Sequence, residues 1–215
     1  MRHFTDQAVY AQIDAILEKD PAEKIVAFAC NWCSYAGADT AGVARMAYPP
    51  NARIIRTMCS ARVNIEFVWY AFKMGAPVVL VSGCHYVDCH YIDANRSTVR
   101  RVDGLWNGLE KAGLRPDRLM LEWCSAAEGA RWQTIMEAVE AKRQSVDGAE
   151  IDRTRVALEK AKVPRPQNPK AKDENAEAGF VCMRCDNQWQ DHYRVEMERI
   201  CPECRSNSVR WLKRS

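Results

Sequence analysis

Short apolar runs alternate with longer stretches of helical periodicity over the first 140 residues. Four runs have the length and composition of strands: KIVAFA (24–29), ARIIRTM (52–58), PVVLVSG (77–83) and RLMLEW (118–123). Helical patterns occupy about 36–48, 62–74, 91–112 and 125–139, and an opening helix is expected over 5–19. This alternation predicts an α/β fold with a doubly wound, flavodoxin-like parallel sheet of about four strands.

The composition changes after residue 140. Residues 141–178 contain no aromatic residue and no cysteine, are rich in charge, and include three prolines within 164–169. They predict a polar linker between an α/β domain (1–140) and a small C-terminal unit (179–215), helical from about 148 to 162 and extended around PRPQNP. A linker of this kind means that the C-terminal unit need not touch the α/β domain to be stable.

Whole-chain properties limit the class of protein. The chain has 215 residues, 47% of them hydrophobic, without a secretory signal pattern in the first twenty and without an apolar stretch long enough to span a membrane. We therefore expect a cytoplasmic protein, in which ten cysteines indicate metal binding or redox chemistry rather than disulfides. A net charge of +3 is too small to indicate a nucleic acid partner.

Six cysteines precede the linker, and all follow predicted strands. They are Cys30 and Cys33 after the first strand, Cys59 after the second, Cys84 and Cys89 after the third, and Cys124 after the fourth. The carboxyl ends of parallel strands meet at one edge of a sheet, where helix N-termini lower thiol pKa values and stabilise thiolates. The sequence therefore predicts a thiolate site at this edge.

Several kinds of chemistry are compatible with such a site. Four or more thiolates suit an iron–sulfur centre better than a catalytic zinc. Alternatively, the thiols only fill space at the sheet edge, or Cys30 and Cys33 in CNWC form the dithiol of a thiol–disulfide oxidoreductase, which would leave the other cysteines unexplained. His85 and His90 could replace thiolates as ligands, or could donate hydrogen bonds to sulfur.

Over about residues 24–140 the chain resembles the delta subunit family of methyl-viologen-reducing hydrogenase, in the segments ACNWCSYAGADTAGVARMAYPPNARIIRTMCSARV, GCHYVDCHY and LEWCSAAEGARW. The resemblance implies a 2Fe-2S cluster and electron transfer between a hydrogenase or dehydrogenase module and the flavin-bearing subunit of heterodisulfide-reductase-type complexes. The family pattern matches at Cys30, Cys33, Cys59, Cys84 and Cys89. It usually has an aliphatic residue in place of Cys124, so five candidates remain for four ligand positions.

The C-terminal unit carries a second set of cysteines. Cys182 and Cys185 are followed, after fifteen residues, by Cys201 and Cys204, which is the spacing of a four-thiolate zinc site. Rubredoxin-type iron would use a longer separation and glycine after each pair. About 37 residues are too few for a sufficient apolar core, so we expect zinc to fold this ribbon.

The sequence thus predicts a non-catalytic electron-transfer subunit of an oxidoreductase complex, with a cluster domain and a zinc ribbon. A zinc-dependent regulatory or nucleic-acid-binding module is the remaining alternative. Acidic residues interrupt the basic ones in the ribbon, which favours docking on a protein over binding to nucleic acid.

Overall fold

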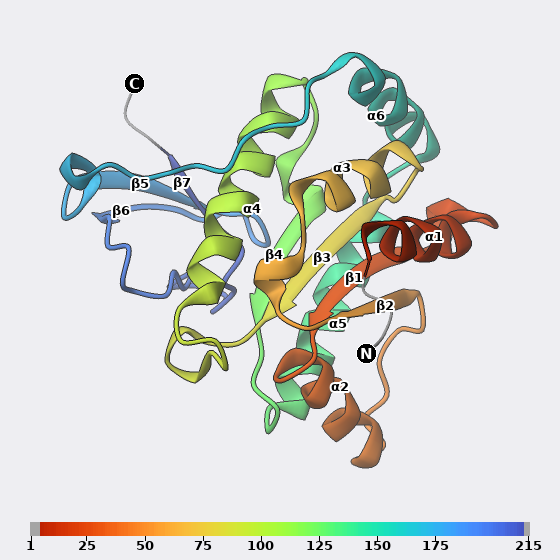
Figure 1. Ribbon diagram of the computed structural model, residues 1–215, viewed down its shortest axis with the longest axis horizontal. Helices are drawn as coiled ribbons and strands as arrows, with labels where there is room; N and C mark the ends of the chain where they lie inside the picture. The colour runs from red at the N-terminus through yellow and green to blue at the C-terminus, as the bar shows by residue number, and fades with distance from the viewer. Residues whose placement is uncertain (1–4, 213–215) are drawn as a thin grey trace.

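The computed structural model describes residues 5–212, and a four-stranded parallel sheet lies at its centre (Figure 1). The strands are β1 (Ile25–Cys30), β2 (Ala52–Thr57), β3 (Val78–Gly83) and β4 (Leu119–Trp123). Their order in the sheet is β2-β1-β3-β4, and each neighbouring pair is parallel. This is the strand order of a flavodoxin-like sheet, so the predicted fold class and all four predicted strands are confirmed.

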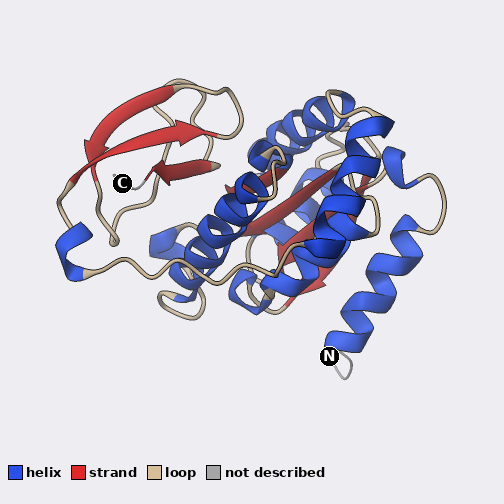
Figure 2. Cartoon of the chain, turned by 90° about the horizontal axis from the view of Figure 1, so that it is seen from above, coloured by secondary structure: helices blue, strands red, loops and turns tan. Residues whose placement is uncertain are grey.

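Helices cover both faces of this sheet (Figure 2). They are α1 (Asp6–Leu17), α2 (Ser34–Val43), α3 (Ile65–Lys73), α4 (Ala94–Lys111), α5 (Gly129–Gln144) and α6 (Gly148–Lys160). Short 3₁₀ turns lie at Pro21–Glu23, Ser60–Arg62, Tyr86–Asp88, Pro116–Arg118 and Ala171–Asp173. In β1, Val26 and Phe28 pack with α1, α3 and α4, whereas Ala27 and Ala29 pack with α2 and α5. The central strands β1 and β3 are buried along their whole length and mostly apolar, because helices cover both of their faces.

Segment 141–178 packs against the α/β part of the chain. Helix α6 confirms the helix predicted over 148–162, and it buries Ile151, Thr154 and Leu158 beside α3. Residues 163–169, which we call the α4 strap, then run along α4 (Figure 1), where Gln167 N donates to the Arg100 carbonyl oxygen at 2.8 Å.

The α4 strap fits because α4 carries two glycines on the face that it covers. A Cβ built on Gly104 would overlap the carbonyl oxygen of Arg165, and one built on Gly108 would lie 2.7 Å from Cγ of Pro164. Two glycines inside one helix are unfavourable for helix formation, so their close approach to the strap gives them a packing role.

The C-terminal ribbon is a small antiparallel sheet of β5 (Glu177–Cys182), β6 (Gln188–His192) and β7 (Val209–Leu212), in the order β6-β5-β7. Phe180, Tyr193 and Trp211 form its apolar core together with the cysteines. The expected small ribbon after the α/β part is therefore present.

The ribbon contacts β4, which is an edge strand of the parallel sheet. Ser208 Oγ accepts from Leu121 N at 2.9 Å, and Asn207 Oδ1 accepts from Trp123 N at 3.2 Å. Glu122 lies between Leu121 and Trp123 in β4 and is only 1% exposed. Its carboxylate accepts from Ser206 Oγ and from Asn207 N. These bonds provide partners for edge groups that would otherwise be buried without any.

The ribbon thus touches the α/β part, whereas the sequence indicated only that it need not do so to be stable. The reason is chemical, since buried polar groups of β4 have their partners in the ribbon. Whether 1–140, 141–178 and 179–215 fold as separate units stays a prediction.

Candidate metal centres

Three cysteines meet where the strand order reverses. The chain passes from β1 outward to β2 and then crosses back to β3 on the other side of β1, so the switch point of the sheet lies between β1 and β3. Cys30 ends β1, Cys33 is the N-cap of α2, and Cys84 directly follows β3. Their sulfur atoms lie within 4.8 Å of one another, and Cys30 Sγ and Cys84 Sγ are 3.9 Å apart. All three are buried.

The other predicted site cysteines lie around this trio. Cys89 is half-buried and packs against it. Cys59 lies beside Cys30, and hydrogen bonding with Cys30 raises its pKa, while its sulfur accepts from Ala61 N at 3.4 Å. Cys124 instead donates to the carbonyl oxygens of Ser125 and Glu128, each at 3.5 Å. The structure therefore brings three of the five candidates together and places Cys89 and Cys59 next to them.

The surroundings favour the thiolate form of two of the three cysteines, Cys30 and Cys84. Hydrogen bonding with Cys30, then with Cys33, lowers the pKa of Cys84 to about 4, and the backbone N–H of His90 adds to this effect. Hydrogen bonding with Cys33 and Cys59 likewise lowers the pKa of Cys30, whereas the pKa of Cys33 is raised because its thiol bonds to Cys30. The N-terminus of α2 adds a positive partial charge beside Cys33. Because thiolates are the metal-binding form of cysteine, the lowered pKa values of Cys30 and Cys84, together with the closeness of all three sulfurs, suit a metal centre.

Sequence reasoning missed the polar residues that hold these cysteines in place. Ser34 Oγ accepts from Cys30 N at 3.1 Å, and Asn95 Nδ2 donates to the carbonyl oxygens of Cys84 and His85 at 3.1 and 3.0 Å. Ser34 and Asn95 are fully buried near the N-termini of α2 and α4. The signal available in the sequence was a polar residue close to a cysteine at a helix start, which is too common to be diagnostic.

The two histidines have partners other than sulfur. His85 Nδ1 lies 2.8 Å from Glu198 and Nε2 lies 2.9 Å from Glu128, and hydrogen bonding to Glu198 is the largest cause of its raised pKa. The His90 ring stacks on Trp32 with 4.0 Å between ring centroids, and Trp32 Nε1 donates to the Tyr91 hydroxyl at 3.2 Å. Both ring nitrogens of His85 therefore face carboxylates.

The four ribbon cysteines form a second cluster. Their sulfur atoms lie within 4.8 Å of one another, with 3.6 Å between Cys182 and Cys204 and 3.7 Å between Cys185 and Cys201. A tetrahedral zinc site with Zn–S bonds of about 2.3 Å would separate its sulfurs by about 3.8 Å. Burial raises the pKa of Cys201, but backbone N–H groups of Cys204 and Glu203 lower it overall. This arrangement fits a single four-coordinate metal ion.

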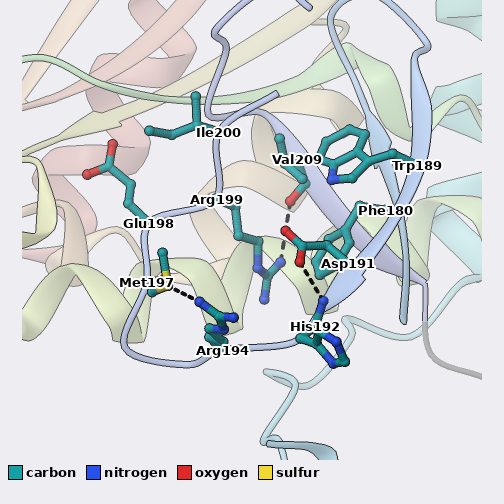
Figure 3. A pocket seen from close by; sticks show the side chains of 10 residues that line it. All are labelled: Phe180, Trp189, Asp191, His192, Arg194, Met197, Glu198, Arg199, Ile200 and Val209. Atoms are coloured by element: carbon teal, nitrogen blue, oxygen red, sulfur yellow. Dashed lines mark hydrogen bonds between the residues drawn. The ribbon is translucent and has the colours of Figure 1, made fainter. Parts of the chain in front are cut away.

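A pocket of about 270 Å³ lies on the ribbon beside Phe180 and Trp189 (Figure 3). Its charged side chains have partners in the protein. Arg199 donates to both oxygens of Asp103, each at 2.9 Å, and Arg194 Nη1 donates to Met197 Sδ at 3.1 Å. We therefore assign no ligand to this pocket.

The helices of the described part of the chain are all too short or too polar to cross a membrane.

The buried thiols at the switch point of a flavodoxin-like sheet, together with a four-thiol ribbon, define an α/β protein with two thiol clusters that could each hold a metal. The family model for the methyl-viologen-reducing hydrogenase delta subunit matches residues 25–147, and the chain belongs to this family. This confirms the resemblance found in the sequence motifs.

Individual relatives are of two kinds, and the first consists of short hydrogenase subunits. The chain is 51% identical over 116 residues to the iron-sulfur subunit of the F420-non-reducing hydrogenase vhc of Methanococcus voltae, covering 54% of this chain and 81% of the relative. An iron-sulfur subunit of the F420-non-reducing hydrogenase of Archaeoglobus profundus is 42% identical over 117 residues, covering 54% of this chain and 85% of the relative.

The second kind is a much longer protein. The chain is 51% identical over 141 residues to a subunit of the ferredoxin/F420H2-dependent CoB-CoM heterodisulfide reductase of Methanosarcina acetivorans. That match covers 65% of this chain but only 18% of the relative, so the matched region is part of a longer polypeptide there.

Proposed function

We propose that this protein is a non-catalytic electron-transfer subunit that carries a 2Fe-2S cluster. It relays electrons between a hydrogenase or dehydrogenase module and a flavin-containing, heterodisulfide-reductase-like subunit. The observation that carries the proposal is the convergence of Cys30, Cys33 and Cys84 within 4.8 Å at the switch point, in a chain whose relatives include iron–sulfur subunits of hydrogenases.

The thiols present suit such a cluster. Cys30, Cys33 and Cys84 would supply three ligands, and Cys89, which packs against them, would supply the fourth. Cys59 is the alternative fourth ligand because it lies beside Cys30. When bound, the cluster supplies one-electron redox chemistry. The chain buries the sulfurs and points the backbone N–H groups of Ala61 and His90 toward Cys59 and Cys84, and both features tune a reduction potential.

The flavoprotein partner is inferred from the long relative. In Methanosarcina acetivorans, a region that is 51% identical to this chain belongs to the same polypeptide as the rest of a heterodisulfide reductase subunit. Such a covalent connection gives two units a high effective concentration, as expected for units that exchange electrons. The hydrogenase subunits among the relatives support a hydrogenase-type module as the electron donor.

We further propose that the ribbon binds zinc through Cys182, Cys185, Cys201 and Cys204. The sulfur separations of 3.6 and 3.7 Å support this assignment, as does the small apolar core of the ribbon. A cytoplasmic location is consistent with ten cysteines, none of them paired in a disulfide among residues 5–212.

The competing functions have less support. Thiol–disulfide exchange requires an accessible thiol, but Cys30 is 1% exposed and Cys33 is 4% exposed. Nucleic acid binding requires free cations, but Arg199 and Arg210 of the ribbon pair with Asp103 and Glu110 of α4.

The relay can be tested directly. The anaerobically purified protein is reduced and then mixed with the oxidised flavin-containing subunit of a heterodisulfide-reductase-type complex, while flavin absorbance is followed. We expect flavin reduction with the unmodified protein and its loss with Cys84→Ser. Flavin reduction at the same rate with both proteins would contradict the relay.

A further inference from the structure

We propose that the ribbon braces the loop that carries two of the cluster cysteines, and that Glu198 is the positioning residue, acting through His85 and the backbone N–H of Tyr86. The cluster loop is defined here as residues 84–92. This inference rests on the proposed function, because it assigns a role to the ribbon at the same metal centre.

The contact is direct and involves both oxygens of one carboxylate. Glu198 Oε1 lies 2.8 Å from His85 Nδ1, and Glu198 Oε2 accepts from Tyr86 N at 3.3 Å. His85 and Tyr86 are the two residues that follow Cys84. The side chains of Glu198 and His85 are only 14% and 20% exposed, so water competes weakly for these bonds. The carboxylate therefore fixes the backbone where it leaves the first cysteine of the cluster loop.

Glu198 is itself held by the ribbon. Asn207 Nδ2 donates to Glu198 Oε1 at 2.9 Å and to the Arg199 carbonyl oxygen at 3.0 Å. The other side of the same amide, Oδ1, accepts from Trp123 N of β4 and from Arg131 of α5. Asn207 is 2% exposed, so all four bonds are protected from solvent. One side chain thus connects the carboxylate that contacts the cluster loop to the α/β sheet.

The second nitrogen of His85 completes the brace. His85 Nε2 lies 2.9 Å from Glu128, in the loop after β4, and Glu128 also accepts from Ser125 N at 2.7 Å. The imidazole is therefore held between an acid of the α/β part and an acid of the ribbon. Glu198 and Asn207 lie outside residues 25–147, where the chain matches the family model. The extension thus adds its own contact to the cluster loop.

The four-thiol site fixes the spacing of the two ribbon residues. Glu198 lies three residues before Cys201, and Asn207 lies three residues after Cys204. Figure 3 shows Glu198 on the opposite side of the pocket from Trp189, while its neighbour Arg199 points toward Val209, whose carbonyl oxygen it bonds at 3.3 Å. A metal bound by Cys201 and Cys204 would fix the segment between Glu198 and Asn207. Because Asn207 bonds to β4, Glu198 would then keep a fixed position relative to that strand.

Because hydrogen bonding and solvent exposure around the sulfurs set the potential of a cluster, a looser cluster loop should change its spectrum and its potential. The test compares Glu198→Ala with Glu196→Ala in the full-length, metal-loaded protein. Glu196 is the matched control, since it lies in the same ribbon loop, is 64% exposed and pairs with Arg96 of α4. The readouts are the EPR spectrum of the reduced cluster, its reduction potential, and amide hydrogen exchange of residues 84–92.

We expect Glu198→Ala to shift the EPR signal and the potential and to accelerate exchange of the cluster loop at least tenfold, with zinc content unchanged. Glu196→Ala should match the unmodified protein. In a His85→Ala background, adding Glu198→Ala should produce a smaller further change than it does alone, because only the bond to Tyr86 N remains to be lost. If Glu198→Ala does not fold, the isosteric Glu198→Gln is measured and should show the same shifts at a smaller size.

Identical spectra, potentials and loop exchange in the Glu198 and Glu196 variants, with iron retained, would overturn the brace and leave the proposed function standing. Absence of iron from the unmodified protein would instead overturn the proposed function. The two failures are therefore distinguishable.

Discussion

Helix α6 offers a quantitative test of whether segment 141–178 is a packed part of the fold. Leu158 is 1% exposed and belongs to the main hydrophobic core together with α3 and α4, whereas Val156 on the same helix is 57% exposed. A buried leucine replaced by alanine loses its transfer free energy and leaves a cavity, so Leu158→Ala should lower the free energy of unfolding by about 2–5 kcal/mol. Val156→Ala should change it by less than about 0.5 kcal/mol.

The assay is urea unfolding of the metal-loaded protein under anaerobic conditions, followed by circular dichroism and tryptophan fluorescence. Similar slopes for the variants would permit comparison of their midpoints as stability differences. Equal midpoints for the Leu158 and Val156 variants would refute the packing of α6 and would return segment 141–178 to a flexible linker. A lower midpoint for the Leu158 variant alone would establish that the helix contributes to the core.

Three further predictions concern the metal sites and the α4 strap. Cys84→Ser or Cys89→Ser should remove or shift most of the visible absorbance, because oxygen is a harder ligand for iron than sulfur. Cys124→Ser should leave the spectrum nearly unchanged. If the Cys84 and Cys89 variants both keep their iron and their spectrum, these two cysteines are not ligands. Gly104→Val should displace the α4 strap and make it sensitive to limited proteolysis. Gly42→Val, in open space on α2, should not. Equal protease resistance of the two variants would contradict the close packing of the strap on α4. A zinc chelator should unfold the ribbon and speed amide hydrogen exchange in β4, whose backbone bonds to the ribbon. Unchanged exchange in β4 after complete loss of zinc would show that the contacts between the ribbon and β4 do not depend on the metal.

The sheet and its thiol edge could be predicted because their signals are local. Continuous apolar runs specify strands buried on both faces, and a cysteine at the end of each run places the thiols at one edge. Cys30, Cys33 and Cys84 converge for this reason. The spacing of the ribbon cysteines is equally local, since each pair occupies a single turn.

The contacts between the ribbon and the α/β part could not be predicted, because they join single polar residues far apart in the sequence. Ser206, Asn207 and Ser208 look like an ordinary turn, yet they bond to β4 residues more than eighty positions earlier. Composition made segment 141–178 look like a free linker, since only Ile151 and Leu158 carry large buried apolar side chains in α6. Two buried residues on a charged helix are too weak a pattern to predict which surface they cover.

The most direct test is metal analysis of the full-length protein purified anaerobically, together with its visible and EPR spectra. We expect about two iron atoms and about one zinc atom per chain, with visible charge-transfer bands that bleach on reduction. Substitution of the four ribbon cysteines should remove the zinc and leave the iron. A colourless protein that contains zinc but no iron would contradict the proposed electron-transfer function.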